Sequence, residues 1–208
     1  MVATRGKFIA FEGIDGSGKS SQIQWVKRKL EEAGYKVYTT FEPTDNKIGS
    51  IIRSILKGDE RADHLTIAAL FAADRLHHLL NQEDGILKKL SEGYIVLTDR
   101  YYFSSYAYHS VHVDMDWVIE INKKSAELLR PDVNIFIDLS PELAMNRIER
   151  NRNKTELFET LDMLKSVYSN YQIAFERMKT VEKICRVDGD DTQELIGEII
   201  MKEIERIL

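Results

Sequence analysis

Short apolar runs alternate with longer helical patterns along the chain. Each run is five to seven residues long and is rich in β-branched and aromatic side chains, which is typical of strands covered on both faces. The intervals between the runs carry helical periodicity, so we expect a parallel sheet with helices on both faces. The five predicted strands cover residues 7–12, 36–41, 94–98, 133–139 and 183–187.

The same pattern predicts four clear helices. They cover residues 19–33, 62–82, 141–150 and 192–208. The third follows Ser140, a residue type that caps helix N-termini. In the last helix the apolar residues predict one stripe that faces the core. That stripe consists of Leu195, Ile196, Ile199, Ile200, Ile204, Ile207 and Leu208.

The composition is that of a folded globular protein. Of 208 residues, 43% are hydrophobic and 30% are charged, which excludes a disordered or collagen-like chain. The net charge of −5 argues against a nucleic-acid polymer as partner. No run of 18 apolar residues and no signal peptide is found, so we expect no membrane contact and a cytoplasmic location. No Pro/Gly/Ser-rich linker divides the chain, which predicts a single domain over residues 1–208.

One strong motif stands between the first predicted strand and the first predicted helix. Residues 13–20 read GIDGSGKS and match G-x-x-x-x-G-K-[ST] in full. The glycines bring backbone N–H groups close to phosphate oxygens, Lys19 supplies charge to the β- and γ-phosphates, and Ser20 offers an oxygen to Mg²⁺. A glycine-rich turn without a ligand would explain neither Lys19 nor Ser20. The predicted ATP-binding residues are Gly13, Ile14, Asp15, Gly16, Ser17, Gly18, Lys19, Ser20 and Ser21.

Further candidates follow the third strand and lie in the helical segments. Asp99 and Arg100 come directly after that strand, where ligands bind in parallel sheets, so Asp99 can reach Mg²⁺ and Arg100 a transferred phosphoryl group. A helix cap and a surface cation are the alternatives. Phe71 lies four residues before Arg75, on the same helix face, which suits a stacked base above an anchored phosphate. Core packing and solvation remain open for this pair.

Four segments together make the chain resemble the thymidylate kinase family. They are FEGIDGSGKSS at 11–21, FEPT…IGSIIRSIL within 41–56, LFAADR at 70–75 and DRYYFSSYAYHS at 99–110. The resemblance implies a three-layer α/β P-loop kinase fold with a short lid. It implies transfer of a phosphoryl group from Mg-ATP to dTMP, giving dTDP and ADP. It also implies a homodimer.

The resemblance assigns roles to residues at matching positions. Lys19 would act in catalysis, and Arg75 and Arg100, with Arg53 as a third contact, would hold the acceptor monophosphate. Phe71 would stack on thymine, and Glu42 would lie close to the phosphates and the metal. The remaining implied substrate contacts are Asp15 to the 3′-hydroxyl, Ser104, Ser105 and Tyr108 around the base and sugar, and His109 near the base.

The chain departs from the family pattern at three places. Phe41 stands where relatives of the bacterial kind have Arg, and His109 stands where Gln is frequent, which leaves the base preference open. The P-loop carries no arginine, so the lid, about residues 150–158, would supply the transition-state cation. The candidates are Arg147, Arg150 and Arg152, and we favour Arg150 or Arg152. A charged helix end explains any one of them nearly as well.

Other functions remain open at this stage. A deoxynucleoside kinase would leave the three acceptor arginines without a common anion, whereas a kinase for another pyrimidine monophosphate would use them. A nucleotide-gated binding protein of the GTPase type would require an N/T-K-x-D motif, which we do not find.

Overall fold

The sheet is formed by five parallel strands. The computed structural model describes residues 6–151 and 160–208. The strands are β1 (Phe8–Glu12), β2 (Val37–Phe41), β3 (Ile95–Asp99), β4 (Val133–Asp138) and β5 (Ile184–Asp188). Their order in the sheet is β2-β3-β1-β4-β5, and all four neighbouring pairs are parallel. The five predicted strands are therefore confirmed, and each boundary differs from the prediction by one residue at most.

Helices connect the strands and cover the sheet. Within the described residues they are α1 (Lys19–Glu32), α2 (Lys47–Lys57), α3 (His64–Leu80), α4 (Ile86–Ser91), α5 (Tyr102–His109), α6 (Met115–Leu128), α7 (Pro141–Asn151), α8 (Leu161–Met178) and α9 (Gln193–Glu205). The four predicted helices correspond to α1, α3, α7 and α9. The first three of these begin and end within two residues of the prediction, and α9 ends three residues earlier than predicted.

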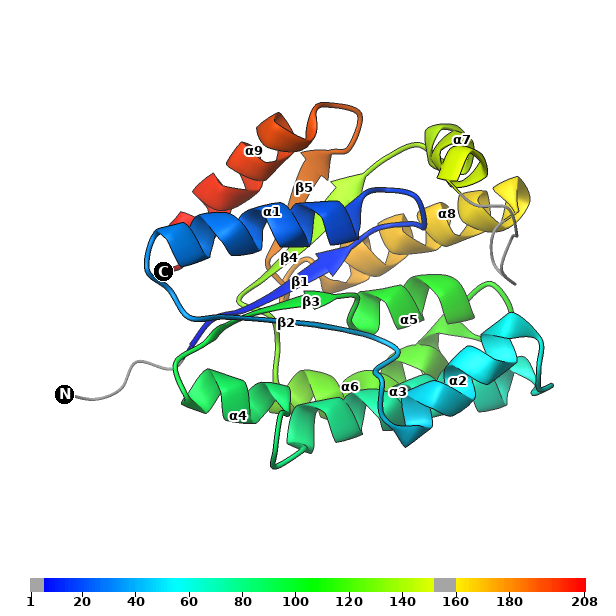
Figure 1. Cartoon of the computed structure of the whole chain (residues 1–208). Coiled ribbons are helices and arrows are strands. Elements are labelled where there is room, and N and C mark those ends of the chain that lie inside the picture. Colours follow the sequence, from blue (N-terminus) through cyan, green and yellow to red (C-terminus); the bar gives the residue numbers. More distant parts are fainter. Residues whose placement is uncertain (1–5, 152–159) are drawn as a thin grey trace.

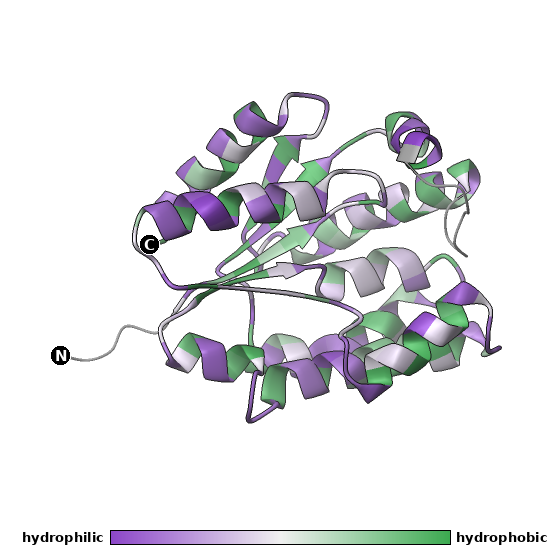
Figure 2. Ribbon diagram, in the orientation of Figure 1, coloured by the Kyte–Doolittle hydropathy of each residue, from purple (hydrophilic) through white to green (hydrophobic). Residues whose placement is uncertain are grey.

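The two faces of the sheet have separate cores, because successive side chains of a strand point to opposite faces. Ile9 and Phe11 pack on one face with residues of α1 and α9, whereas Phe8 and Ala10 pack on the other with residues of α5 and α8. In Figure 1, α1 and α9 lie on one side of the sheet and α3, α4, α5, α6 and α8 on the other. The hydropathy colouring in Figure 2 shows apolar strands between helices with mixed surfaces. This arrangement confirms the α/β class with helices on both faces.

The apolar stripe predicted for the C-terminal helix is narrower in the structure. Ile196, Ile200 and Ile204 follow i, i+4 spacing and are buried against the sheet. Leu195 and Ile199 lie one position earlier on the helix and are about two-fifths exposed, at 42% and 40%. The prediction of a single wide stripe was wrong because one packed sheet covers only one side of the helix.

The topology brings the P-loop and the end of β3 together. Phe11 of β1 pairs with Asp99 of β3, and the N–H of Arg100 donates to the Phe11 carbonyl at 2.9 Å. The carboxyl ends of these central strands therefore meet at one edge, where parallel sheets bind ligands. No helix in the described part of the chain is long and apolar enough to cross a membrane.

Candidate active site

The P-loop forms a backbone cradle at the start of α1. Gly16 and Gly18 have φ angles of +78° and +98°, which favour glycine. A Cβ on Gly16 would lie 2.5 Å from the Ala144 carbonyl oxygen, so a side chain cannot fit there. Gly18 caps α1 without a side-chain hydrogen bond. The first N–H groups of the helix are therefore available to an anion, and the helix dipole favours it.

Lys19 lies inside this cradle. Its Nζ donates to the carbonyl oxygens of Gly13 and Ile14, both at 3.1 Å, and the residue is only 6% exposed. Burial and the nearby Arg100 lower the pKa of Lys19 to about 8. A phosphate beside Lys19 would offset both effects. The buried Ser17 hydroxyl has no hydrogen-bond partner among the described residues, so it too fits a polar ligand.

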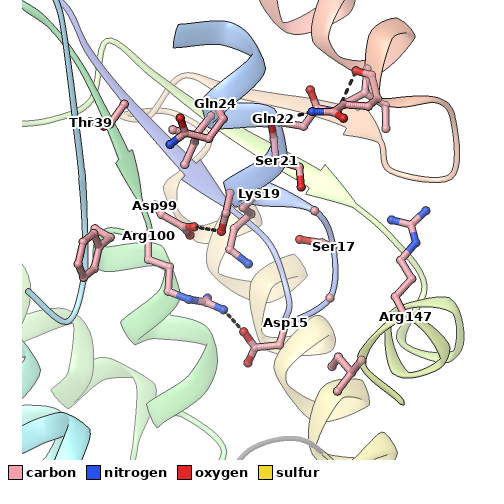
Figure 3. A pocket seen from close by; sticks show the side chains of 18 of the residues that line it. Asp15, Ser17, Lys19, Ser21, Gln22, Gln24, Thr39, Asp99, Arg100 and Arg147 are labelled. Atoms are coloured by element: carbon pink, nitrogen blue, oxygen red, sulfur yellow. Dashed lines mark hydrogen bonds and ion pairs between the residues drawn. The ribbon is translucent and has the colours of Figure 1, made fainter. Parts of the chain in front are cut away.

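Ser20 and Asp99 place two oxygen ligands side by side. The Ser20 hydroxyl donates to Asp99 Oδ2 at 2.7 Å, as Figure 3 shows. Mg²⁺ prefers oxygen ligands and commonly binds through one or two protein groups together with substrate phosphates. No cluster of three His, Cys, Asp or Glu side chains suited to a metal occurs in residues 6–151 and 160–208. The pair therefore fits Mg²⁺ held with a nucleotide rather than a cage of protein ligands.

Arg100 is held against the P-loop by a dense set of contacts. Its Nη2 lies 2.5 Å from Asp15 Oδ1 and donates to the Tyr108 hydroxyl at 3.1 Å, and its Nη1 donates to Ser104 Oγ at 2.9 Å. Burial alone would raise the pKa of Asp15, but Arg100 and Lys19 outweigh it and lower that pKa. Arg100 has a φ of +73°, a left-handed conformation that is costly for a residue with a side chain. The structure thus brings together Asp15, Arg100, Ser104 and Tyr108 as the sequence predicts.

The P-loop and the end of β3 border a cavity of about 870 Å³ (Figure 3). Its lining includes many of the residues predicted from the sequence: Asp15, Gly16, Ser17, Gly18, Lys19, Ser20, Ser21, Glu42, Asp99 and Arg100. Phe41 also lines it and is 44% exposed. Another part of the wall is formed by Arg147, one of the three lid candidates, and by Ile148, Asp191 and Gln193, which the sequence did not indicate as nucleotide contacts.

Arg75 is surrounded by protein partners. It is 1% exposed and contacts Glu42 through two nitrogens, Nε at 2.8 Å and Nη2 at 2.6 Å. Nη1 donates to the side chains of Ser105 and Asn122, and Nη2 also donates to the Tyr101 carbonyl. A guanidinium has five N–H donors, and these contacts use all five. Arg75 therefore braces Glu42, which lines the cavity. A phosphate contact by Arg75 stays a prediction.

Arg53 also binds groups of the protein, in the loop after β2. Its Nη1 donates to the carbonyl oxygens of Pro43 and Thr44, and its Nη2 lies 3.3 Å from the Asp45 carboxylate. Asp74 of α3 accepts from the backbone N–H and the hydroxyl of Thr44, both at 2.7 Å. The loop after β2 is therefore fixed from α2 and α3. A phosphate contact by Arg53 stays a prediction.

Phe71 and His109 face each other at the predicted base site. Their ring centroids are 4.8 Å apart, and His109 is buried. Burial, with a further contribution from Arg75, lowers the pKa of His109 to about 3. The imidazole is therefore neutral near pH 7, with one donor and one acceptor nitrogen. Ser105 lies four positions before His109 in α5, and its hydroxyl accepts from Arg75 Nη1 at 3.1 Å.

Little of the predicted lid falls in the described part of the chain. Arg150 is exposed near the end of α7, and Arg152 lies outside the described residues, as do residues 153–158. Arg147, one turn earlier on α7, donates to the Gly189 carbonyl at 2.9 Å and lines the cavity. The choice between Arg150 and Arg152 stays a prediction.

Two functional candidates escaped the sequence analysis. Glu12 ends β1 and accepts hydrogen bonds from the Tyr101 N–H and from the hydroxyls of Ser104 and Tyr171. A charged residue that ends an otherwise apolar strand was a usable signal for Glu12. Tyr171 lies in α8, 159 positions further along the chain, and no local pattern marks it.

Comparison with known proteins agrees with this geometry. The family model described as thymidylate kinase matches residues 11–200. A thymidylate kinase of Caldicellulosiruptor saccharolyticus is 38% identical over 208 residues, covering 98% of both chains. A probable thymidylate kinase of Pyrococcus horikoshii is 37% identical, covering 88% of this chain and 91% of its own. One of Archaeoglobus fulgidus is 37% identical, covering 96% and 95%. The chain therefore belongs to the thymidylate kinase family.

Proposed function

We propose that the protein transfers the γ-phosphoryl group of Mg-ATP to dTMP, giving dTDP and ADP. The observation that carries the proposal is the position of Arg100. Its guanidinium lies against the P-loop carboxylate of Asp15 and borders the same cavity as Lys19. A second phosphate at Arg100 would therefore face the phosphates held by the P-loop.

The donor side is built to hold a triphosphate. The backbone N–H groups at the start of α1 and the buried Lys19 would neutralise the β- and γ-phosphates. Ser20 and Asp99 would hold Mg²⁺ together with the nucleotide, and the ion would supply positive charge to the phosphates. ATP is the donor that the family and the P-loop together support.

The acceptor side needs no strong general base. A monophosphate has a second pKa near 6, so it is mostly dianionic at pH 7. One of its oxygens attacks the γ-phosphorus, the bond from that phosphorus to the β–γ bridging oxygen breaks, and ADP leaves with the bonding electrons. Arg100 would orient the attacking phosphate and neutralise part of its charge. Asp15 would accept from the sugar 3′-hydroxyl while it holds Arg100.

The base would bind between α3 and α5. Phe71 offers a face for stacking, and neutral His109 and Ser105 offer hydrogen bonds to the base edge. Tyr108, fixed by its hydroxyl at 3.0 Å from Asp15, would crowd the 2′ position and favour deoxyribose. In this proposal Glu42, held by Arg75, forms a rigid part of the pocket wall next to the phosphates.

We also propose that two chains form a homodimer. The support is the apolar surface of neighbouring helices: Ile51 of α2 and Leu65 and Leu80 of α3 are 44–54% exposed. Light scattering after gel filtration should give twice the 24.1 kDa of one chain. A mass of one chain at micromolar concentration would contradict the dimer.

A coupled ADP-release assay over a panel of acceptors tests the function. With Mg-ATP, dTMP should give the highest kcat/KM, and dTDP should appear in equal amount to ADP. Thymidine should give no product, because it brings no anion to Arg100. Preference for thymidine would favour a deoxynucleoside kinase, and preference for another pyrimidine monophosphate would favour that rival. Slow ADP release without any phosphorylated acceptor would indicate a nucleotide-gated binding protein.

A further inference from the structure

Glu12 is a fully buried carboxylate that immediately precedes Gly13, the first residue of the P-loop. It ends β1 and is the only charged residue of that strand. Its Oε2 accepts from the Ser104 hydroxyl at 2.6 Å and from the Tyr171 hydroxyl at 3.0 Å, and its Oε1 accepts from the Tyr101 N–H at 2.9 Å. Three elements, α5, α8 and the end of β3, therefore converge on one carboxylate.

The direction of these hydrogen bonds also affects how Ser104 binds Arg100. An ionised carboxylate can only accept, so the Ser104 proton points at Glu12. The Ser104 oxygen is then left to accept from Arg100 Nη1, which lies 2.9 Å away, while the Tyr171 hydroxyl lies 2.8 Å from the same oxygen. A donor in place of the carboxylate oxygen would compete with Arg100 for the Ser104 oxygen and would turn the Ser104 proton away. The charge on Glu12 thus strengthens the grip of Ser104 on Arg100.

The backbone contact acts on the same residue. Arg100 has a φ of +73°, and such a conformation persists only where its surroundings hold it. The Arg100 N–H donates to Phe11, and the next N–H, that of Tyr101, donates to Glu12. Glu12 therefore fixes the backbone that follows Arg100 through the Tyr101 amide. It also fixes the Arg100 side chain through Ser104.

We propose that Glu12 is a positioning residue for phosphoryl transfer, which holds Arg100 through Ser104 and the Tyr101 amide in the orientation that meets the acceptor phosphate. The inference rests on the proposed function, because it takes Arg100 as the phosphate contact. Glu12 itself touches no substrate.

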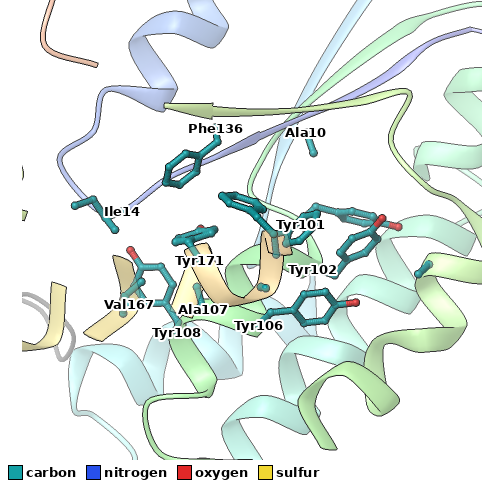
Figure 4. Packing of buried hydrophobic residues seen from close by; sticks show 14 of the residues in the cluster. Ala10, Ile14, Tyr101, Tyr102, Tyr106, Ala107, Tyr108, Phe136, Val167 and Tyr171 are labelled. Atoms are coloured by element: carbon teal, nitrogen blue, oxygen red, sulfur yellow. The ribbon is translucent and has the colours of Figure 1, made fainter. Parts of the chain in front are cut away.

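The energetics of Glu12 fit a role in function rather than in folding. Burial raises its pKa to about 6, although Ser104, Arg100 and Tyr171 act to lower it. The stability linked to protonated Glu12 is therefore fully present below its ordinary pKa of 4.5 and is lost as the pH rises through about 6, so the ionised carboxylate costs stability at neutral pH. The charged and titratable groups around it are Lys19 of α1, Arg100 after β3, Tyr101, Tyr106 of α5 and Tyr171 of α8. Figure 4 shows the Tyr171 ring between Phe136 and Tyr108. Glu12 itself is fully buried.

The Glu12→Gln variant isolates the charge. Its amide oxygen can still accept from the Tyr101 N–H, whereas its NH₂ group faces the two hydroxyls. We expect kcat at saturating dTMP and Mg-ATP to fall about tenfold or more at pH 8, as for the loss of a charge-assisted hydrogen bond. The ratio of wild-type to variant kcat should approach one near pH 5, because protonated Glu12 resembles glutamine. This ratio cancels the titration of the substrate phosphate.

Glu182→Gln provides the matched control. Glu182 is also a buried carboxylate that accepts from a tyrosine, the Tyr102 hydroxyl at 2.6 Å, but it lies at the other end of the sheet near the start of β5. This variant should lower the melting temperature and leave the ratio of wild-type to variant kcat independent of pH. A pH-dependent ratio of the same form in Glu182→Gln would show that the loss of any buried carboxylate suffices, which would overturn the proposal.

A double-mutant cycle with Ser104→Ala tests the route from Glu12 to Arg100. If Glu12 acts through Ser104, Glu12→Gln should cost less than threefold in the Ser104→Ala background. The full loss in that background, or a ratio that does not change between pH 5 and pH 8, would contradict the proposal. Should Glu12→Gln fail to fold, Ser104→Ala alone decides: it should lower kcat about tenfold, and wild-type turnover would overturn the inference.

A different variant distinguishes failure of the proposed function from failure of the positioning role of Glu12. Arg100→Gln removes the phosphate contact and leaves Glu12 in place. Full turnover of dTMP by Arg100→Gln would refute the role of Arg100 in the proposed function, whatever the Glu12 variants show. Loss of turnover in Arg100→Gln with no effect of Glu12→Gln would refute only the positioning role.

Discussion

Two arginines beside α5 illustrate how differently one residue type is used in this molecule. Arg100 packs against the P-loop, borders the cavity and has a side chain that is 16% exposed. Arg75 has a side chain that is 1% exposed, and protein groups accept from all five of its N–H donors. Two neighbouring serines accept hydrogen bonds from them: Ser104 from Arg100 and Ser105 from Arg75. Each arginine already has a carboxylate partner, Asp15 for Arg100 and Glu42 for Arg75. Only Arg100 borders the cavity, so only Arg100 can gain a phosphate there as a further partner.

Replacement of Arg75 should have the largest effect, and on stability. Arg75→Gln leaves Glu42 buried without its cation, which costs about 3–5 kcal/mol of the free energy of unfolding. Urea denaturation measures this directly. The double variant Arg75→Met/Glu42→Met serves as control, because removing both charges should restore part of the loss. A stable Arg75→Gln protein with strongly impaired dTMP binding would indicate that Arg75 contacts the dTMP phosphate.

Replacement of Arg100 should act on turnover instead. We expect Arg100→Gln to lower kcat/KM for dTMP about 10- to 100-fold, because a charge-assisted hydrogen bond to the phosphate is lost. The melting temperature should change by only a few degrees, since the side chain borders the cavity. Steady-state kinetics and thermal unfolding on the same preparation separate the two effects. A large loss of stability without any loss of turnover would erase the contrast with Arg75.

Phe71 should affect binding of the base. Phe71→Ala removes the stacking face opposite His109, and we expect the KM for dTMP to rise about tenfold, in line with the usual energy of base stacking. Phe71→Leu, which keeps volume without a flat ring, is the matched control and should give an intermediate KM. An unchanged KM in Phe71→Ala would show that the base binds elsewhere.

The smallest expected effect concerns the pH dependence of stability. Burial, with a further contribution from Arg75, lowers the pKa of His109 to about 3. In the unfolded chain His109 therefore binds a proton near pH 6.5, whereas in the folded chain it stays neutral at that pH. The stability that neutral His109 contributes is therefore present above about pH 6.5 and declines as the pH falls. Between pH 7 and pH 5.5 the wild-type protein should lose about 1 kcal/mol more than His109→Gln, as measured by urea denaturation. Equal losses would show that His109 titrates normally.

The sequence predicted the P-loop side of the site better than the base side, and the reason is physical. Gly16, Gly18, Lys19 and Ser20 are neighbours in sequence, so one short motif specifies the cradle and its charges. Strand runs are equally local, and they predicted the sheet. The surroundings of Arg75 depend instead on Glu42, Ser105, Asn122 and Tyr101, which come from four separate stretches of the chain. No spacing within α3 distinguishes an arginine that meets a ligand from one that meets those partners.

Glu12 illustrates the same limit. Its place at the end of an apolar strand is visible in the sequence, but its partners Ser104 and Tyr171 are 92 and 159 positions away. The short helices α4 and α5 and the helices α6 and α8 were also not predicted as elements, because their apolar positions are distributed among several packing partners. Tertiary contacts decide these features, and a pattern along one segment does not contain them.

The most direct measurement is a crystal structure of the protein with dTMP, Mg²⁺ and a non-hydrolysable ATP analogue. The account predicts the triphosphate in the cradle of residues 13–20, with the dTMP phosphate within hydrogen-bond distance of the Arg100 guanidinium and Arg75 still bound to Glu42. A dTMP phosphate bound to Arg75, or one remote from both Arg100 and the ATP phosphates, would contradict it.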